Sequence, residues 1–160
     1  MFPAPAEANQ YLAEHIAIVR DSYRKLLGRD LLSASPSLSG SEAARAIWEA
    51  PFMVVSHDTA ADPIFNYANQ ATLKLFAMTW EEFTALPSRQ SAEPPTREER
   101  AHLLAQVTAN GFVENYSGIR IAKTGQRFEI RNVTVWNLTR PNGTYVGQAA
   151  TYSDRELRFL

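Results

Sequence analysis

Cysteine is absent from the 160-residue sequence. Disulfides, thiolate nucleophiles and thiolate metal sites are therefore excluded. Because structural disulfides are rare in the cytosol, a sequence without cysteine fits a cytoplasmic protein. The N-terminal segment MFPAPAEANQ also lacks the basic patch and the apolar core of a secretory signal. We therefore expect a cytoplasmic location.

An excess of charge and a long apolar run are missing as well. The net charge is −1 at pH 7, so no basic field indicates nucleic acid or an anionic membrane as a partner. No apolar run approaches the ~20 residues that span a bilayer. The length fits one domain with a sizeable core. These observations favour a globular protein with no nucleic-acid partner and no membrane partner.

Motifs for catalysis are absent from the sequence. The three histidines are scattered over unrelated segments, and there is no Gly-x-Ser-x-Gly elbow or glycine-rich phosphate loop. His57, Asp58 and Asp62 lie close together, but a solvated turn explains them better than a metal site. No paired carboxylates fall on convergent strands. We therefore predict a protein that is not an enzyme and has no metal site.

Residues 62–89 hold the strongest local signals. An Asp-Pro breaker precedes a short strand at 64–67. Asn69 then caps a brief helix, and Thr79 with Glu82 forms a capping box that begins a second one. Two such short helices cannot form a core of their own. We expect them to lie across a sheet made mostly from the C-terminal third.

The N-terminal residues 7–27 form an amphipathic pattern, with Gly28 as a stop just past the last turn. Residues 33–40 form a Ser/Pro/Gly loop, after which Ser41 caps a short helix. The apolar stripe of the long helix either covers the sheet of its own chain or pairs with a second copy. This stripe consists of Leu12, Ile16, Val19, Tyr23, Leu26 and Leu27. We divide the chain into a helical extension over residues 1–50 and a domain over residues 51–160.

The strand pattern predicts a five-stranded antiparallel sheet in an α+β fold, with short helices over one face. Residues 52–55 form a strand that is apolar on both sides, and 112–121, 126–138 and 144–152 form a meander joined by glycine-containing turns. In the middle strand the apolar parity changes, which predicts a bulge near Arg131 and Asn132. A capping box at Thr96 begins a helix that ends near Asn110.

The order of strand, asparagine, short helix, aromatic and Thr-x-Glu-Glu resembles the front half of a PAS domain. The runs PFMVVSHDTAADPIFNYANQATLKLFAMTWEEFTALPSRQSAEPPTREERAHLLAQV and GFVENYSGIRIAKTGQRFEIRNVTVWNLTRPNGTYVGQAATYSD resemble the MEKHLA family more narrowly. This PAS-like family occurs as stand-alone bacterial proteins and at the C-terminus of plant class III homeodomain–leucine-zipper regulators. The resemblance implies a PAS-like fold and a sensing or interaction role. Many PAS domains end in Asp-Ile-Thr, of which only Asp154 remains here, so we expect no effector domain after it.

The resemblance also bears on the cofactor, which we leave unknown. Haem-binding PAS domains use a histidine on the long helix, but His102 points about 150° away from the apolar face of that helix. Light-sensing PAS domains need a cysteine for the flavin adduct. Non-covalent flavin binding stays open because Asn132 and Gln148 lie on central strands. The alternative is that these two side chains satisfy backbone or bulge groups.

A twisted sheet with small helices over one face leaves room for a pocket. The residues that we expect to line it are Tyr67, Phe76, Phe83, Tyr116, Phe128, Trp136, Asn132 and Gln148. The alternative is that these aromatics fill a core. We predict a non-enzymatic sensor or interaction module that binds a small apolar or heterocyclic ligand or an unidentified protein partner, and that forms a homodimer through its N-terminal helix. The alternatives are a small α+β enzyme with an NTF2-like cavity, or a flavin- or haem-binding PAS protein.

Overall fold

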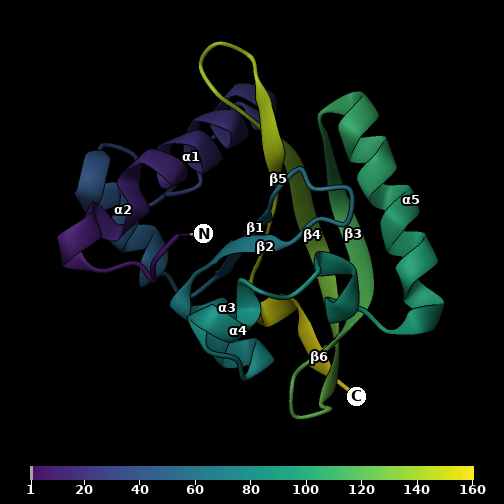
Figure 1. The fold of residues 1–160 in the computed structure, drawn as a ribbon. Coiled ribbons are helices and arrows are strands. Elements are labelled where there is room, and N and C mark those ends of the chain that lie inside the picture. The colour runs from purple at the N-terminus through teal and green to yellow at the C-terminus, as the bar shows by residue number, and fades with distance from the viewer. Residues whose placement is uncertain (1) are drawn as a thin grey trace.

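One antiparallel sheet runs through the molecule in the order β2-β1-β5-β4-β3 (Figure 1). The structure is a computed structural model that describes residues 2–160, apart from the side chains of residues 94–96. The strands are β1 (Met53–His57), β2 (Phe65–Ala68), β3 (Phe112–Ile121), β4 (Arg127–Thr139), β5 (Tyr145–Tyr152) and β6 (Leu157–Phe159). The short β6 pairs with the first part of β4. The predicted α+β fold with an antiparallel sheet is confirmed, and β6 adds a sixth strand.

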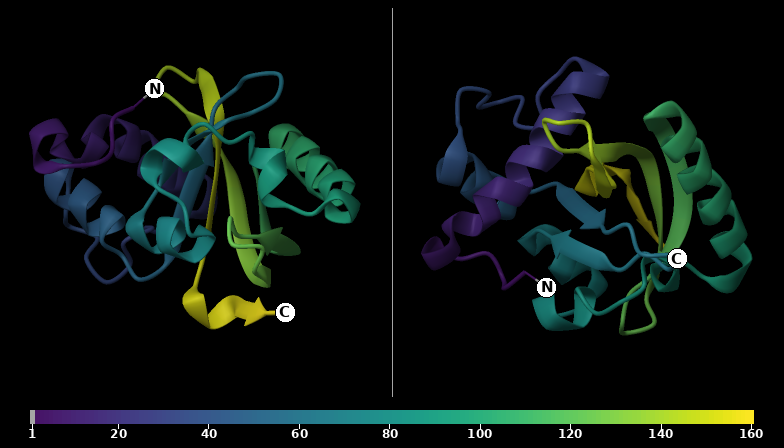
Figure 2. Two further views of the ribbon diagram at one scale, coloured as in Figure 1. Left: turned by 60° about the horizontal axis from the view of Figure 1, so that its bottom comes forward. Right: turned by 45° about the horizontal axis from the view of Figure 1, so that its top comes forward.

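Helices cover both faces of this sheet (Figures 1 and 2). The helical segments are η1 (Glu7–Leu12), α1 (Ala13–Leu27), α2 (Gly40–Trp48), α3 (Gln70–Phe76), α4 (Trp80–Phe83), η2 (Ser88–Ser91), α5 (Pro94–Asn110) and η3 (Asp154–Glu156). Two cores result: one lies under α1 and α2, and the other lies on the side of α3 and α5. The central β1 is buried on both sides, as its apolar run predicts. Among residues 2–160, no helix combines the length and hydrophobicity that crossing a membrane requires.

The predicted bulge lies at Asn132, whose φ of 53° is in the left-handed region. It breaks the register between Gly118↔Ile130 and Tyr116↔Val133. Ile130 and Val133 therefore share one core although their sequence parity differs. The bulge thus directs both halves of β4 toward the same helices.

The N-terminal helix is shorter than its sequence pattern suggests. The α-helix begins at Ala13, because Gln10 and Tyr11 have positive φ and interrupt the preceding 3₁₀ segment. It ends at Gly28, which has a φ of 70°, as predicted. Its apolar stripe is buried against its own sheet, and the Trp136 indole Nε1 donates to the Val19 carbonyl at 3.1 Å. Of the two alternatives, the structure shows the helix packed on its own chain.

The predicted caps of the short helices are confirmed. Asn69 Oδ1 accepts from the Thr72 amide, and Thr79 and Glu82 form the reciprocal capping box. The cap of α2 is wrong by two residues, because Ser39 is the last residue with extended backbone before the helix. The predicted capping box at Thr96 lies outside the described side chains. α5 already begins at Pro94, where proline suits the first turn because no amide is needed there.

Candidate ligand-binding site

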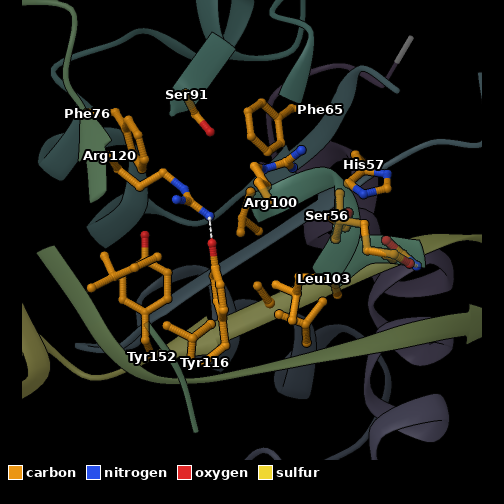
Figure 3. Close-up of a pocket in the computed structure, with 18 of the residues that line it drawn as sticks. Ser56, His57, Phe65, Phe76, Ser91, Arg100, Leu103, Tyr116, Arg120 and Tyr152 are labelled. Carbon is orange, nitrogen blue, oxygen red and sulfur yellow. Dashed lines mark hydrogen bonds between the residues drawn. The ribbon is translucent and has the colours of Figure 1, made fainter. Parts of the chain in front are cut away.

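A cavity of about 60 Å³ lies between α5 and the sheet (Figure 3). Strands β1, β2, β3, β4 and β5 contribute lining residues, and so do α3, α4, η2 and α5. Its apolar lining includes Val55, Phe65, Phe76, Phe83, Leu103, Ile130 and Val133. Its polar lining consists of Ser56, His57, Ser91, Arg100, Tyr116, Arg120, Gln148 and Tyr152. The cavity therefore combines an apolar shell with buried charge.

Arg100 reaches the cavity because it lies on the buried face of α5. It precedes Leu103 by three residues and Val107 by seven, so the three share one face of the helix. Its side chain is 8% exposed. Among the described side chains, no hydrogen-bond acceptor and no carboxylate pairs with it. Burial, together with the nearby charge of Arg120, lowers the pKa of the Arg100 guanidinium to about 9.

Arg120 enters the same space from β3, where it lies on the same face of the strand as Tyr116 and Gly118. Figure 3 shows Arg120 directed toward Tyr116. It is 7% exposed, and its Nη2 donates to the Tyr116 hydroxyl at 3.1 Å. A side chain at Gly118 would interfere, because a Cβ there would lie 2.6 Å from the Tyr116 hydroxyl and 2.8 Å from Arg120 Nη1. The missing side chain at position 118 therefore lets the guanidinium fold back over the strand.

His57 closes the cavity at the end of β1. Its Nδ1 lies 2.9 Å from the Asp58 carbonyl, which can only accept, so Nδ1 carries the proton. Its Nε2 is buried without a hydrogen-bond partner in the described chain. Burial lowers the pKa of His57. The imidazole is therefore neutral near pH 7 and presents an acceptor.

Two amide side chains fasten α5 to the sheet. Gln148 Nε2 donates to the Leu104 carbonyl at 3.1 Å and to Thr108 Oγ1 at 3.0 Å. Asn137 Nδ2 donates to the Val107 carbonyl at 2.9 Å. These bonds hold the C-terminal half of α5. Its middle, with Arg100 and Leu103, covers the cavity.

The sequence model of the MEKHLA domain matches residues 13–157. The chain belongs to the MEKHLA family. Among its relatives, the homeobox-leucine zipper protein ATHB-9 of Arabidopsis thaliana is 25% identical over 124 residues, which are 76% of this chain and 15% of that protein. ATHB-14 of the same plant is 22% identical over 119 residues, which are 73% of this chain and 14% of that protein. The MEKHLA domain thus corresponds to a small part of these longer proteins.

Solved structures confirm the PAS-like fold of this MEKHLA domain. A PAS domain from Colwellia psychrerythraea has a TM-score of 0.61 and 16% identity, covering 74% of this chain and 93% of that one. A light-oxygen-voltage domain, solved in a study of a flavin analogue, has a TM-score of 0.58 and 18% identity, with 74% and 84% covered. The light-state dimer of the fungal photoreceptor Vivid has a TM-score of 0.53 and 18% identity, with 66% and 79% covered.

Four of the eight predicted pocket residues meet at the cavity of the MEKHLA domain: Phe76, Phe83, Tyr116 and Gln148. Phe128 is buried beside them and contacts Phe76 edge to face, but it does not line the cavity. Tyr67 and Trp136 belong to the opposite core, under α1 and α2. Asn132 is exposed at the bulge. The expected pocket is therefore divided between the two faces of the sheet.

Sequence reasoning missed most of the apolar lining and both charged residues of the cavity, Arg100 and Arg120. The helical period could have placed Arg100 on the buried face of its helix, because it falls on the same face as Leu103 and Val107. The two-residue period of a strand could have placed Arg120 on the same face as Tyr116. Neither signal names a ligand, but both place a charge where an apolar side chain is expected.

The cavity does not fit a flavin or a haem. Sites for drug-sized ligands enclose about 300–1,000 Å³, whereas this cavity has about 60 Å³. His102 is exposed on α5, as predicted, and hydrogen-bonds with the Gln106 amide. It therefore cannot reach the cavity to ligate iron. In the described part of the chain, no three His, Asp or Glu side chains form a group that could hold a metal ion.

Proposed function

We propose that this MEKHLA domain is a non-enzymatic sensor module whose sensing site is the cavity under α5. The observation that carries the proposal is a set of buried polar groups that have no partner within the described chain. Arg100 and His57 Nε2 are the main examples. A buried polar group without a partner costs about 1–3 kcal/mol, and more when charged. Such groups are stabilised if a ligand supplies the partner.

The composition of the cavity favours binding without turnover. General acid–base catalysis usually relies on a carboxylate or a histidine at the reacting atoms. Among the lining side chains that the structure describes there is neither Asp nor Glu, and His57 is the one imidazole. The NTF2-like enzyme alternative therefore has little support from the side chains present.

Binding is expected to act on α5. Gln148 and Asn137 fix the C-terminal half of this helix, while its middle lies over the cavity. A ligand between Arg100 and the sheet would tighten the middle of the helix, and an empty cavity would leave it looser. Changes in α5 could then be transmitted to an unidentified protein partner.

A thermal-shift experiment tests the sensing site with 1-propanol, propionamide and propionate as probes. At least one probe should raise the Tm saturably, since occupancy at a hundred times Kd stabilises by about 2.7 kcal/mol. Ala150→Leu, which adds methyl groups in the cavity, should abolish the shift, and the milder Val133→Ile should reduce it. Hydrogen exchange should slow in α5 when the probe binds. If none of the probes stabilises the protein, the cavity is not a sensing site.

We also propose a homodimer, as predicted from the sequence. The structure of Vivid with a similar fold is a light-state dimer. Because the apolar stripe of α1 is buried on its own sheet, the dimer has to use another surface or release the helix. Light scattering on the purified chain, with and without residues 1–28, tests this. A monomer at all concentrations would rule the dimer out.

A further inference from the structure

Two buried arginines share the cavity, and no described carboxylate neutralises them. Arg100 and Arg120 are 8% and 7% exposed. Among the described residues, each of the nine ion pairs involves another arginine or Lys123, and neither Asp nor Glu lines the cavity. Buried arginines are ordinarily paired, because an isolated charge loses its hydration without compensation. The cavity therefore has a positive charge that is left for a ligand to balance.

Hydrogen-bond donors surround this charge. The Tyr116 hydroxyl accepts from Arg120, so its own proton remains available. Burial raises the pKa of the Tyr152 hydroxyl, which therefore keeps its proton. Figure 3 shows Arg120, Tyr116 and Tyr152 on one side of the cavity and Arg100 across from them. Arg120 already donates to the Ile119 carbonyl at 3.0 Å and to the Tyr116 hydroxyl, so the Arg100 guanidinium and the two phenol protons are the donors that a ligand can engage.

The shape of the cavity limits the ligand. A volume of about 60 Å³ corresponds to the share of about two waters in the liquid. Outside it lies an open cleft of about 440 Å³, and the two spaces share His57, Leu104 and Gln148 as lining residues. These three residues lie between the cavity and the cleft.

We propose that the ligand is a small organic carboxylate, with its carboxylate between Arg100 and Arg120 and its carbon chain against the apolar lining. The proposal rests on the sensing role assigned to this cavity. Guanidinium groups match a carboxylate in geometry and charge. An apolar wall that includes Phe76, Ile130 and Val133 favours a carbon chain over a phosphate, which is polar on all sides. The two arginines come from separate elements, Arg100 from α5 and Arg120 from β3.

An amide NMR titration tests the charge requirement. The probes are propionate and propionamide, which have nearly the same shape but differ in charge, at constant ionic strength. Propionate should cause saturable shifts at the amides of Gly118 and α5, with a Kd at least tenfold lower than that of propionamide. Equal affinity for the two probes would overturn the proposal. Tighter binding of inorganic phosphate than of propionate would also overturn it.

Variants locate the site. Arg100→Gln removes one charge, and Gly118→Ala keeps both charges but displaces Arg120 and Tyr116. Each should weaken propionate binding at least tenfold and weaken propionamide binding by a smaller factor, so that the preference for propionate falls. Arg131→Gln is the matched control, because it removes an exposed arginine that pairs with Glu129 on the surface. An equal loss in the control would show non-specific attraction and refute the assignment.

The outcomes also separate this inference from the sensing role on which it rests. Binding of 1-propanol or propionamide in the cavity, together with no preference for propionate, would overturn only the carboxylate assignment. Failure of all these probes to bind the wild-type protein would overturn both.

Discussion

Replacing Arg100 with methionine should stabilise the protein, although it removes a buried side chain. Most core substitutions destabilise, so the sign of this effect is informative. Methionine keeps an unbranched apolar stem that can pack against Leu103, and it removes the charge. If the guanidinium stabilised the fold, Arg100→Met would lower the free energy of unfolding instead.

The magnitude follows from the environment of the guanidinium. Its pKa falls from 12.5 to about 9, with burial as the largest cause and Arg120 as the second. At about 1.4 kcal/mol per pKa unit, this corresponds to roughly 5 kcal/mol against the charged form. Part of that gain is lost because the methionine side chain fills less space. Replacing a buried ion pair with apolar side chains of similar volume is often neutral or stabilising by about 1–4 kcal/mol. For Arg100, which has no carboxylate partner among the described residues, we expect a gain of about 1–3 kcal/mol.

Urea unfolding at pH 7, followed by circular dichroism, measures the effect. For a slope of about 2 kcal/mol per molar urea, the midpoint should rise by about 1 M at unchanged slope. Arg131→Met, at an exposed position, should stay within about 0.5 kcal/mol of the wild type. If Arg100→Met lowered the free energy of unfolding by about 1 kcal/mol or more, the guanidinium would stabilise the fold. Arg100 would then not be a charge that lacks a partner until a ligand binds.

Four further predictions concern the structure around the cavity and the opposite core. Trp136→Ala should cost about 3–5 kcal/mol in urea unfolding, because the indole is fully buried; a cost under 1 kcal/mol would contradict its packing. Gln148→Leu should cost about 1–3 kcal/mol and speed hydrogen exchange in α5, because three acceptors lose their donor; unchanged exchange would show that the amide does not fasten the helix. Gly147→Ala should cost about 2–4 kcal/mol, since its Cβ would lie 2.1 Å from the His57 carbonyl oxygen; a stability equal to wild type would refute this close approach. Burial lowers the pKa of His15 to about 4, so between about pH 6.5 and 4 this imidazole takes up a proton only in the unfolded chain. The free energy of unfolding should therefore fall by up to about 3 kcal/mol as the pH drops through this range. His15→Gln should flatten this part of the urea-unfolding profile, and an unchanged profile would exclude His15 as its source.

Local chemistry made the middle of the chain predictable. Asn69 and Thr79 predict the start of their helices, because their side-chain oxygens accept hydrogen bonds from the backbone amides three residues later. The bulge at Asn132 was predictable because the apolar parity of β4 changes across it. These signals are contained within a few residues and do not depend on the rest of the fold.

The division of the pocket depends on long-range register, which was harder to predict. Trp136 has the opposite parity to Val133 and Val135, so beyond the bulge it faces α1. Tyr67 has the parity of Phe65 but lies in the other core, because the pairing of β1 with β2 is irregular between Ser56 and His57. No short-range sequence signal marks that irregularity.

The two faces of the sheet are joined by neighbouring residues of the same strands. On β4, Val135 lines the cavity, and the indole Nε1 of the next residue, Trp136, donates a hydrogen bond to the Val19 carbonyl of α1. On β1, Val55 lines the cavity, and the hydroxyl of the next residue, Ser56, lies 3.0 Å from His15 Nε2 on α1. Close-packed cores cannot absorb a shift on one side alone. A ligand that moves β1 or β4 at the cavity would therefore change the packing of α1 on the opposite face while that helix stays docked.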